Sequence, residues 1–169
     1  MISYSSFVNF ILFSSFISFI SLSLFRVKLI LSFFKIVSSI KWFDVINTDN
    51  RCLLSGKGNL SLFSNHDGIC SNDHVIIKGG NYSLETNDDG IRGKDSVEIE
   101  NGEFTIKAGG DGIKASNEED TSKGYINIKE GTFNITAKSD GIQAITKLTI
   151  DGGTYTITSS EGLEATYIK

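Results

Sequence analysis

Residues 87–115 read NDDGIRGKDSVEIENGEFTIKAGGDGIKA, and this stretch contains the step Asp-Gly-Ile twice. The glycines of the two steps, Gly90 and Gly112, are 22 residues apart. The same step begins at Asp67 and at Asp140, and a relaxed form, Glu-Gly-Leu, begins at Glu161. A recurring interval between 20 and 50 residues is typical of solenoid proteins, in which each repeat forms one coil.

A second series of glycines repeats in the same register. The step glycines are separated by 22, 22, 29 and 21 residues, and the second series is separated by 22, 22, 29 and 22. This second series consists of Gly58, Gly80, Gly102, Gly131 and Gly153. A seven-residue insertion within SNEEDTSK, residues 116–123, explains the long interval in both series. We expect the extra residues around Asn117–Lys123 to bulge from one turn as a mobile loop without a strand.

Between the glycines, apolar and polar residues alternate, as in VEIE and GEFTIKA, which predicts short strands with one buried face. One coil cannot bury its own apolar row, but coils stacked about 4.8 Å apart cover one another. We therefore predict an all-β fold, a right-handed parallel β-helix of about five coils and about 22 residues per coil, over residues 51–169. A β-sandwich, the rival fold, does not predict a fixed period or ladders of like residues. Because the sequence ends at TYIK, inside a predicted coil, we interpret it as a fragment.

The first 50 residues differ from the rest in composition. Residues 1–25 carry no charged side chain, and FVNFILFSSFISFISLSLF is long enough to cross a bilayer, which takes roughly 20 apolar residues. A hydrophobic signal or membrane anchor is one interpretation, which makes the membrane a partner through residues 1–43 and puts the domain outside the cell or on its surface. An artefact of the gene model is the other, since the basic region and cleavage site of a good signal peptide are lacking.

Charge and cysteine content exclude several classes of function. Residues 1–50 contain four basic and two acidic side chains, whereas the chain from Arg51 onward contains 12 basic and 18 acidic ones. This negative balance argues against nucleic acid as a partner. Cys52 and Cys70 form neither a disulfide framework nor a zinc-binding spacing, and we favour free thiols over a single bridge.

Stacked coils would also stack the acids of the repeated step. Like charges would then lie within roughly 5 Å of each other, which requires a counter-ion or raised pKa values. Calcium is a natural candidate because it prefers several hard oxygen ligands. Turn capping, in which each aspartate bonds the backbone two residues on, is the alternative. The predicted metal ligands are Asp67, Asp89, Asp111, Asp140 and Glu161, with Asn87 and Asp88, and further candidates are Asn65, Asp73 and Asp95.

The other two residues of the step have structural roles in this prediction. The glycine permits a turn with a positive φ and a close approach between coils, and the isoleucine fills the core below it.

The repeats DGIRGKDSVEIENGEFTIKAGGDGIKA and DGIQAITKLTIDGGTYTITSSEGLEA resemble the carbohydrate-binding β-helix family of secreted proteins from cellulose-degrading clostridia and other gut-type microbes. The resemblance covers about residues 56–169. It implies a right-handed parallel β-helix similar to polysaccharide lyases, and calcium at the positions of Asp67, Asp89, Asp111 and Asp140. It also implies association with plant cell-wall polymers such as cellulose and polygalacturonate.

Three functions follow as alternatives. The first, which we favour, is non-catalytic, calcium-dependent binding of plant cell-wall polysaccharide, either polygalacturonate and pectin or cellulose. The second is a calcium-dependent, pectate-type polysaccharide lyase, in which a Lys or Arg removes a proton. The third is an inert structural or adhesive repeat protein. Arg92 and Lys114 follow the step glycine by two residues and face the acids, so they are candidates for substrate binding, with ordinary salt bridges as the alternative role.

Overall fold

The computed structural model describes residues 43–48 and 51–169, with side chains described from residue 51. The predicted signal, anchor or artefact in residues 1–42 lies outside the described residues. Within the described part of the chain, no helix is both long and apolar enough to span a membrane. The described residues form strands joined by turns, as the alternating pattern predicts.

Most strands are short, because glycine-containing turns interrupt each segment of alternating apolar and polar residues. Strands of similar length recur from one repeat to the next. In chain order they are β1 (Phe43–Thr48), β2 (Arg51–Gly56), β3 (Asn59–Ser64), β4 (Ile69–Ser71), β5 (His74–Ile77), β6 (Asn81–Thr86), β7 (Ile91–Gly93), β8 (Ser96–Ile99), β9 (Glu103–Ala108), β10 (Ile113–Ala115), β11 (Tyr125–Ile128), β12 (Thr132–Ala137), β13 (Asp140–Ile150), β14 (Thr154–Thr158) and β15 (Glu161–Ile168).

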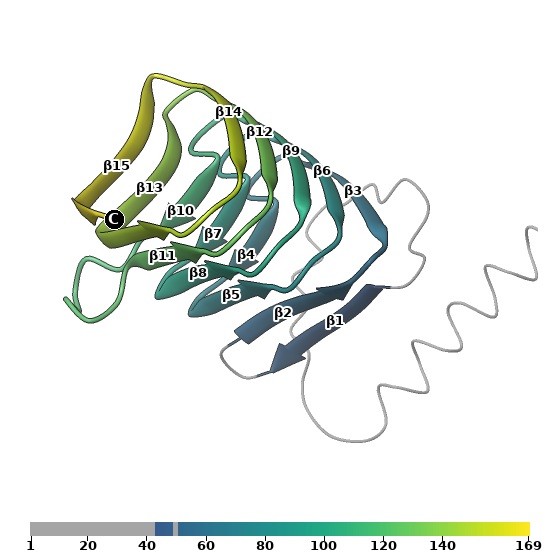
Figure 1. Cartoon of the computed structure of the whole chain (residues 1–169), viewed down its shortest axis with the longest axis horizontal. Coiled ribbons are helices and arrows are strands. Elements are labelled where there is room, and N and C mark those ends of the chain that lie inside the picture. The colour runs from purple at the N-terminus through teal and green to yellow at the C-terminus, as the bar shows by residue number, and fades with distance from the viewer. Residues whose placement is uncertain (1–42, 49–50) are drawn as a thin grey trace, which may run out of the picture. The chain divides into compact units, whose positions relative to one another are not determined.

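These strands stack as a parallel β-helix of about five coils (Figure 1). One face is the five-stranded parallel sheet β14-β12-β9-β6-β3. The ten-stranded sheet forms the other two faces, which join at the long strand β13, since its first half pairs with β10 and its second half with β11. The all-β class and the 22-residue repeat are therefore confirmed.

Equivalent residues of successive repeats pair directly. Ile113 is the register partner of both Ile91 and Ile142, and all three side chains are fully buried. The offset to Ile142 is longer because the insertion leaves the coil between β10 and β11, where no strand forms and the chain projects outward (Figure 1). The insertion thus forms no strand and bulges as a loop, as predicted.

A column of aromatic rings fills one side of the core. Tyr82, Phe104, Phe133 and Tyr155 stack face to face, with ring centroids 4.8, 4.7 and 4.8 Å apart and interplanar angles of at most 4°. This spacing is the distance between adjacent strands of a sheet, so the backbone ladder imposes the stacking. The tyrosine hydroxyls remain satisfied, because Tyr82 donates to the carbonyl of Gly79 and Tyr155 to that of Gly152.

The edge of the solenoid near residue 43 is covered by a strand that the repeat does not predict. Strand β1 pairs with β2 in the antiparallel sense over six residue pairs, from Phe43 with Gly56 to Thr48 with Arg51. The other pairings in the described chain are parallel. An antiparallel edge strand occupies hydrogen-bonding groups that the first coil would otherwise present to a neighbouring chain.

The expected positive φ at the step glycines is wrong. Among the described residues, positive φ occurs instead at four glycines of the second series, for example Gly102 with φ +147°, and at Gly56 and Gly124 outside both series. At the step, glycine is required by close approach, since a Cβ on Gly90 would lie 2.5 Å from the carbonyl oxygen of Gly112. The expected close approach between coils is therefore confirmed.

Candidate functional site

The acids of the repeated step form a column along one edge of the solenoid. They lie at the turns that precede the short strands β4, β7 and β10 and at the start of β13. Asp89, Asp111 and Asp140 are buried, with 6%, 3% and 7% of their surface exposed. The carboxylates of Asp67, Asp89 and Asp111 each accept a hydrogen bond from the backbone N–H of the next acid in the column. The distances are 3.3 Å from Asp89 N to Asp67 Oδ1, 2.8 Å from Asp111 N to Asp89 Oδ1 and 2.9 Å from Asp140 N to Asp111 Oδ1. The aspartates therefore cap the backbone of the adjacent coil, rather than the backbone two residues on.

The other carboxylate oxygen, Oδ2, of three column aspartates contacts a side chain on β7, β10 or β13. This side chain lies three residues after the acid of its own repeat. Arg92 Nε lies 2.7 Å from Asp67 Oδ2, and Lys114 Nζ lies 2.5 Å from Asp111 Oδ2. In the next coil Gln143 takes the same position, and its Nε2 donates to Asp140 Oδ2 at 2.9 Å and to Glu164 Oε2 at 2.7 Å. The two predicted substrate-binding residues thus lie against the column, and each forms an ion pair there.

Burial and mutual repulsion raise the pKa of acids in the column. Burial raises the pKa of Asp89, although its hydrogen bond from the Asp111 backbone and the charge of Lys114 oppose the shift. The pKa of Asp140 rises to about 6, first because of burial and then because of the neighbouring Glu164, Asp111 and Glu161. In the last part of the column Gln143 takes the place of a cation, so the repulsion between the carboxylates there is not offset by a positive side chain.

The same charges hold the two cations in their protonated form. Burial lowers the pKa of Lys114, but the hydrogen bond to Asp111 and the charges of Asp89, Asp111 and Asp140 outweigh it, so the pKa lies above its ordinary value. The pKa of Arg92 is raised in the same way, because Asp67 outweighs the effect of burial.

Two groups of three carboxylates are close enough to share a cation, with ligand atoms within 4.8 Å of one another. One consists of Asp67, Asp88 and Asp89, and the other of Asp140, Glu161 and Glu164. Oxygen-only ligands fit calcium rather than a soft metal. Gly110 leaves space at the first group, since a Cβ there would lie 2.6 Å from Asp89 Oδ1 and 2.9 Å from Asp88 Oδ1. The residues present therefore fit a calcium ion at either end of the column.

The other sequence-predicted ligands lie apart from these two groups. Asp111 is absent from both, and its Oδ2 atom contacts the ammonium of Lys114. Asn87 is exposed and its side-chain amide reaches Asn65 Oδ1 only at 3.5 Å. Glu164 was not predicted, although the register of the repeat places it in the same row as Arg92, Lys114 and Gln143.

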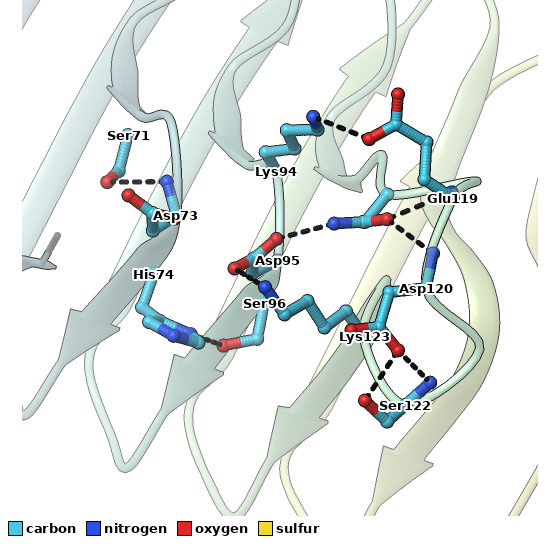
Figure 2. A network of polar contacts seen from close by, with 11 residues as sticks. Ser71, Asp73, His74, Lys94, Asp95, Ser96, Glu119, Asp120, Ser122 and Lys123 are labelled. Carbon is cyan, nitrogen blue, oxygen red and sulfur yellow. Dashed lines mark hydrogen bonds and ion pairs between the residues drawn. The ribbon is translucent and has the colours of Figure 1, made fainter.

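Asp95 belongs to a separate polar network at the insertion (Figure 2). Its buried carboxylate accepts a hydrogen bond from Asn117 Nδ2 at 2.6 Å and pairs with Lys123 Nζ at 2.8 Å. Asn117 Oδ1 in turn accepts the backbone N–H groups of Glu119 and Asp120, both at 3.0 Å. Asp95 thus anchors both ends of the insertion and is not available as a ligand for the column. Asp73 occupies the position equivalent to Asp95 in the preceding repeat. Its backbone N–H donates a hydrogen bond to Ser71 Oγ.

The fold defines a parallel β-helix, and sequence comparison places this β-helix in a carbohydrate-binding class. The family model described as carbohydrate-binding domain-containing protein matches residues 45–169, and the chain belongs to this family. Its match begins within β1, before the predicted domain start at residue 51.

A solved structure supports the same fold. It is the gadolinium derivative of the polysaccharide lyase-like protein from C. thermocellum, which is 32% identical to this chain with a TM-score of 0.66. The match covers 73% of this chain and 55% of the other, so the chain spans about half the length of that protein. No curated protein sequence matches the chain.

Proposed function

We propose that this domain binds acidic plant cell-wall polysaccharide, such as polygalacturonate or pectin, without cleaving it and in a calcium-dependent manner. The observation that carries the proposal is the arrangement of the column, in which two calcium-compatible carboxylate groups flank Arg92 and Lys114 along one edge of a carbohydrate-binding domain. The domain is net negative, so a negatively charged polymer needs cations at the contact.

Calcium would be held by Asp67, Asp88 and Asp89 at one end and by Asp140, Glu161 and Glu164 at the other. Bound there, it would supply positive charge shared between protein and uronate carboxylates. The gadolinium derivative of the related protein is compatible with this proposal, because trivalent lanthanides also prefer hard oxygen ligands.

Arg92 and Lys114 would contact uronate carboxylates directly. Their side chains are 34% and 27% exposed, so each is held in place by an aspartate and still reaches solvent. Arg92 uses its Nε donor on Asp67, and a guanidinium carries further N–H donors that suit a carboxylate. The ion pairs with the column then position the two cations for binding.

The alternative of a polysaccharide lyase is less compatible with these cations. A lyase base must be deprotonated to remove a proton from the uronate, so its pKa should be lowered toward the working pH. The pKa values of Lys114 and Arg92 are instead raised, because neighbouring carboxylates outweigh the effect of burial. Among the described residues, these are the cations that contact the column.

Cellulose is also a weaker candidate than polyuronate. Flat crystalline glycans are commonly bound by rows of exposed aromatic rings, which offer stacking surface. In this domain the row formed by Tyr82, Phe104, Phe133 and Tyr155 is stacked within the core. We further propose that the domain acts outside the cell or on its surface, where the polymer occurs, with residues 1–43 as signal or anchor.

Calcium titration combined with a pull-down on polygalacturonate tests the proposal. At calcium a hundred times the dissociation constant, binding to the folded state adds about 2.7 kcal/mol to the free energy of unfolding, and chelator removes it. The double variant Asp88→Asn with Asp89→Asn should lose the stabilisation that comes from the first calcium group and should lose polygalacturonate binding. The exposed Asp151→Asn is the matched control.

Each alternative has its own outcome. A parent protein whose stability and binding ignore calcium would support the inert repeat protein. Release of unsaturated sugar products, followed by their absorbance, would support the lyase.

A further inference from the structure

A half-open hollow of about 270 Å³ lies at the corner where the two halves of β13 meet, beside the end of the acid column. The pairing of β13 with β15 shifts register at this corner, between Ala144 and Lys147. Register irregularities re-aim side chains and interrupt the close packing of strands, which explains a hollow at this point. Its lining consists of Gln143, Ala144 and Ile145 from β13 and Glu164, Ala165 and Thr166 from β15.

The closing residues of the insertion lie directly against this corner. Thr146 donates through Oγ1 to the carbonyl of Lys123 at 2.6 Å, and its backbone N–H donates to the carbonyl of Gly124 at 3.0 Å. A Cβ on Gly124 would lie 3.0 Å from Cβ of Ile145, which lines the hollow. Since Lys123 is itself fixed by Asp95, the insertion supports one side of the hollow. Insertions in solenoid repeats often map to the binding face.

The chemistry of the lining differs from that of the column beside it. Along the row of outward side chains, Arg92 and Lys114 are followed by the neutral Gln143 and then by the acidic Glu164. Among the described residues no cation lines the hollow, so as long as Glu164 holds no calcium its carboxylate disfavours a uronate. Gln143 Nε2 donates to Asp140 and Glu164, and the Thr166 hydroxyl donates to the carbonyl of Ile145 at 2.8 Å. The oxygen atoms of Gln143, Glu164 and Thr166 can therefore accept hydrogen bonds from sugar hydroxyls. Ile145 and the two alanines supply the apolar part that ligand sites usually contain.

We infer that this hollow is a subsite for one uncharged sugar unit of the bound polysaccharide, whose hydroxyls contact Gln143, Glu164 and Thr166. Pockets for drug-sized ligands measure roughly 300–1,000 Å³, so the hollow has room for a single ring. The inference rests on the proposed polysaccharide binding and deepens it. It assigns charged units of the polymer to Arg92, Lys114 and calcium-bound carboxylates, and a neutral unit to the corner when Glu164 holds no calcium.

Titration of the full chain with a neutral gluco-oligosaccharide and a neutral xylo-oligosaccharide, followed by NMR of the backbone amides in chelator, tests this inference. Chelator is used because Glu164 also belongs to a candidate calcium group. At least one sugar should shift the amide signals of residues 143–146 and 164–166. Shifts confined to the outer face of β3, β6, β9, β12 and β14, or no shifts with either sugar, would overturn the inference.

A filling variant with a matched control makes the test specific. Thr166→Trp places a large side chain in the hollow from an exposed position, and should weaken oligosaccharide binding at least tenfold. Thr156→Trp introduces the same side chain at an exposed position of β14, in the other sheet, and should leave binding unchanged. Equal binding by both variants would contradict a subsite at the corner. Unchanged melting temperatures would show that both variants remain folded.

The failure of this inference is distinguishable from failure of the proposed function. Polygalacturonate binding in calcium, lost in the variant Asp88→Asn with Asp89→Asn, reports on the column alone. If that binding holds and neither neutral sugar binds, only the corner subsite is wrong. If a neutral sugar binds at the corner and polygalacturonate does not bind, the corner subsite stands and the acidic polymer is wrong.

Discussion

Oδ1 of Asp89 accepts the backbone N–H of Asp111 at 2.8 Å, across the interface between two coils. The same contact joins Asp111 to Asp140 at 2.9 Å. The acid of the repeated step therefore has a structural role independent of any ligand, because it satisfies a buried backbone donor of its neighbour. It also places a row of carboxylates along one edge, and this row is what a cation can use.

This contact predicts different effects for two substitutions of Asp89. Asp89→Ala leaves the buried N–H of Asp111 without a partner, which should lower the free energy of unfolding by about 1–3 kcal/mol. Asp89→Asn keeps an acceptor oxygen for this N–H. It also removes a charge that burial disfavours, as the raised pKa of Asp89 shows, so we expect no loss of stability. Urea denaturation in chelator measures both. Equal losses in the two variants would show that the carboxylate charge, rather than the hydrogen bond, stabilises the column.

The aromatic column predicts that position along the stack sets the cost of truncation. Phe104 is covered by a ring on each side, so Phe104→Ala should cost about 3–5 kcal/mol of unfolding free energy. Tyr155 is covered on one side and is only half-buried, so Tyr155→Ala should cost clearly less. The exposed Thr105→Ala, next to Phe104, is the control and should change stability by at most about 0.5 kcal/mol. Thermal or urea unfolding provides the comparison, and equal costs at the two ring positions would contradict it.

The coil architecture was predictable because every repeat carries the same alternating pattern and the same spacing. The alternation around Phe104 and Ile106 indicates which side chains face inward, and the 22-residue spacing indicates what lies above and below each of them. Pairing of Ile91 with Ile113 follows from these two facts alone. Local pattern and global fold agree, so no long-range information was needed.

Features that do not repeat were not predictable in the same way. Strand β1 pairs once, in the antiparallel sense, and residues 43–48 carry no copy of the repeat. The anchoring of the insertion by Asp95 depends on how Lys123 folds back, which spacing does not determine. The column acids were found from the sequence, but their partition into two groups was not, because it depends on the ion pair between Lys114 and Asp111.

Close approach between coils predicts that the step glycines are intolerant of substitution except at the end of the stack. A Cβ on Gly90 would lie 2.5 Å from the carbonyl oxygen of Gly112 and equally close to Cγ2 of Ile106, so Gly90→Ala should severely destabilise the fold. Gly162 occupies the same step in the last coil, where nothing lies within 4 Å, so Gly162→Ala should be tolerated. Melting temperatures compare the two variants. If both were destabilised alike, a backbone requirement at the step, rather than crowding, would be responsible.

The ion pair between Asp95 and Lys123 predicts a pH-dependent contribution to stability. Burial raises the pKa of Asp95, but hydrogen bonds from Lys123 and Asn117 outweigh it, so the pKa lies below its ordinary value of 3.8. The unfolded chain then takes up this proton at a higher pH than the folded chain. The stabilisation is therefore fully present above about pH 4, and is lost as the pH falls through the folded pKa.

Asp95→Asn isolates this contribution from that of the other carboxylates. The variant should be less stable than the parent at pH 6, and the difference between their free energies of unfolding should shrink as the pH is lowered from 4 toward 2.5. Urea denaturation at each pH measures the difference, and Glu118→Gln, which alters an exposed acid of the same insertion, is the control. A difference that stays constant with pH would mean that Asp95 acts only as a hydrogen-bond acceptor for Asn117. In that case the charge of Lys123 would not hold the insertion against the solenoid.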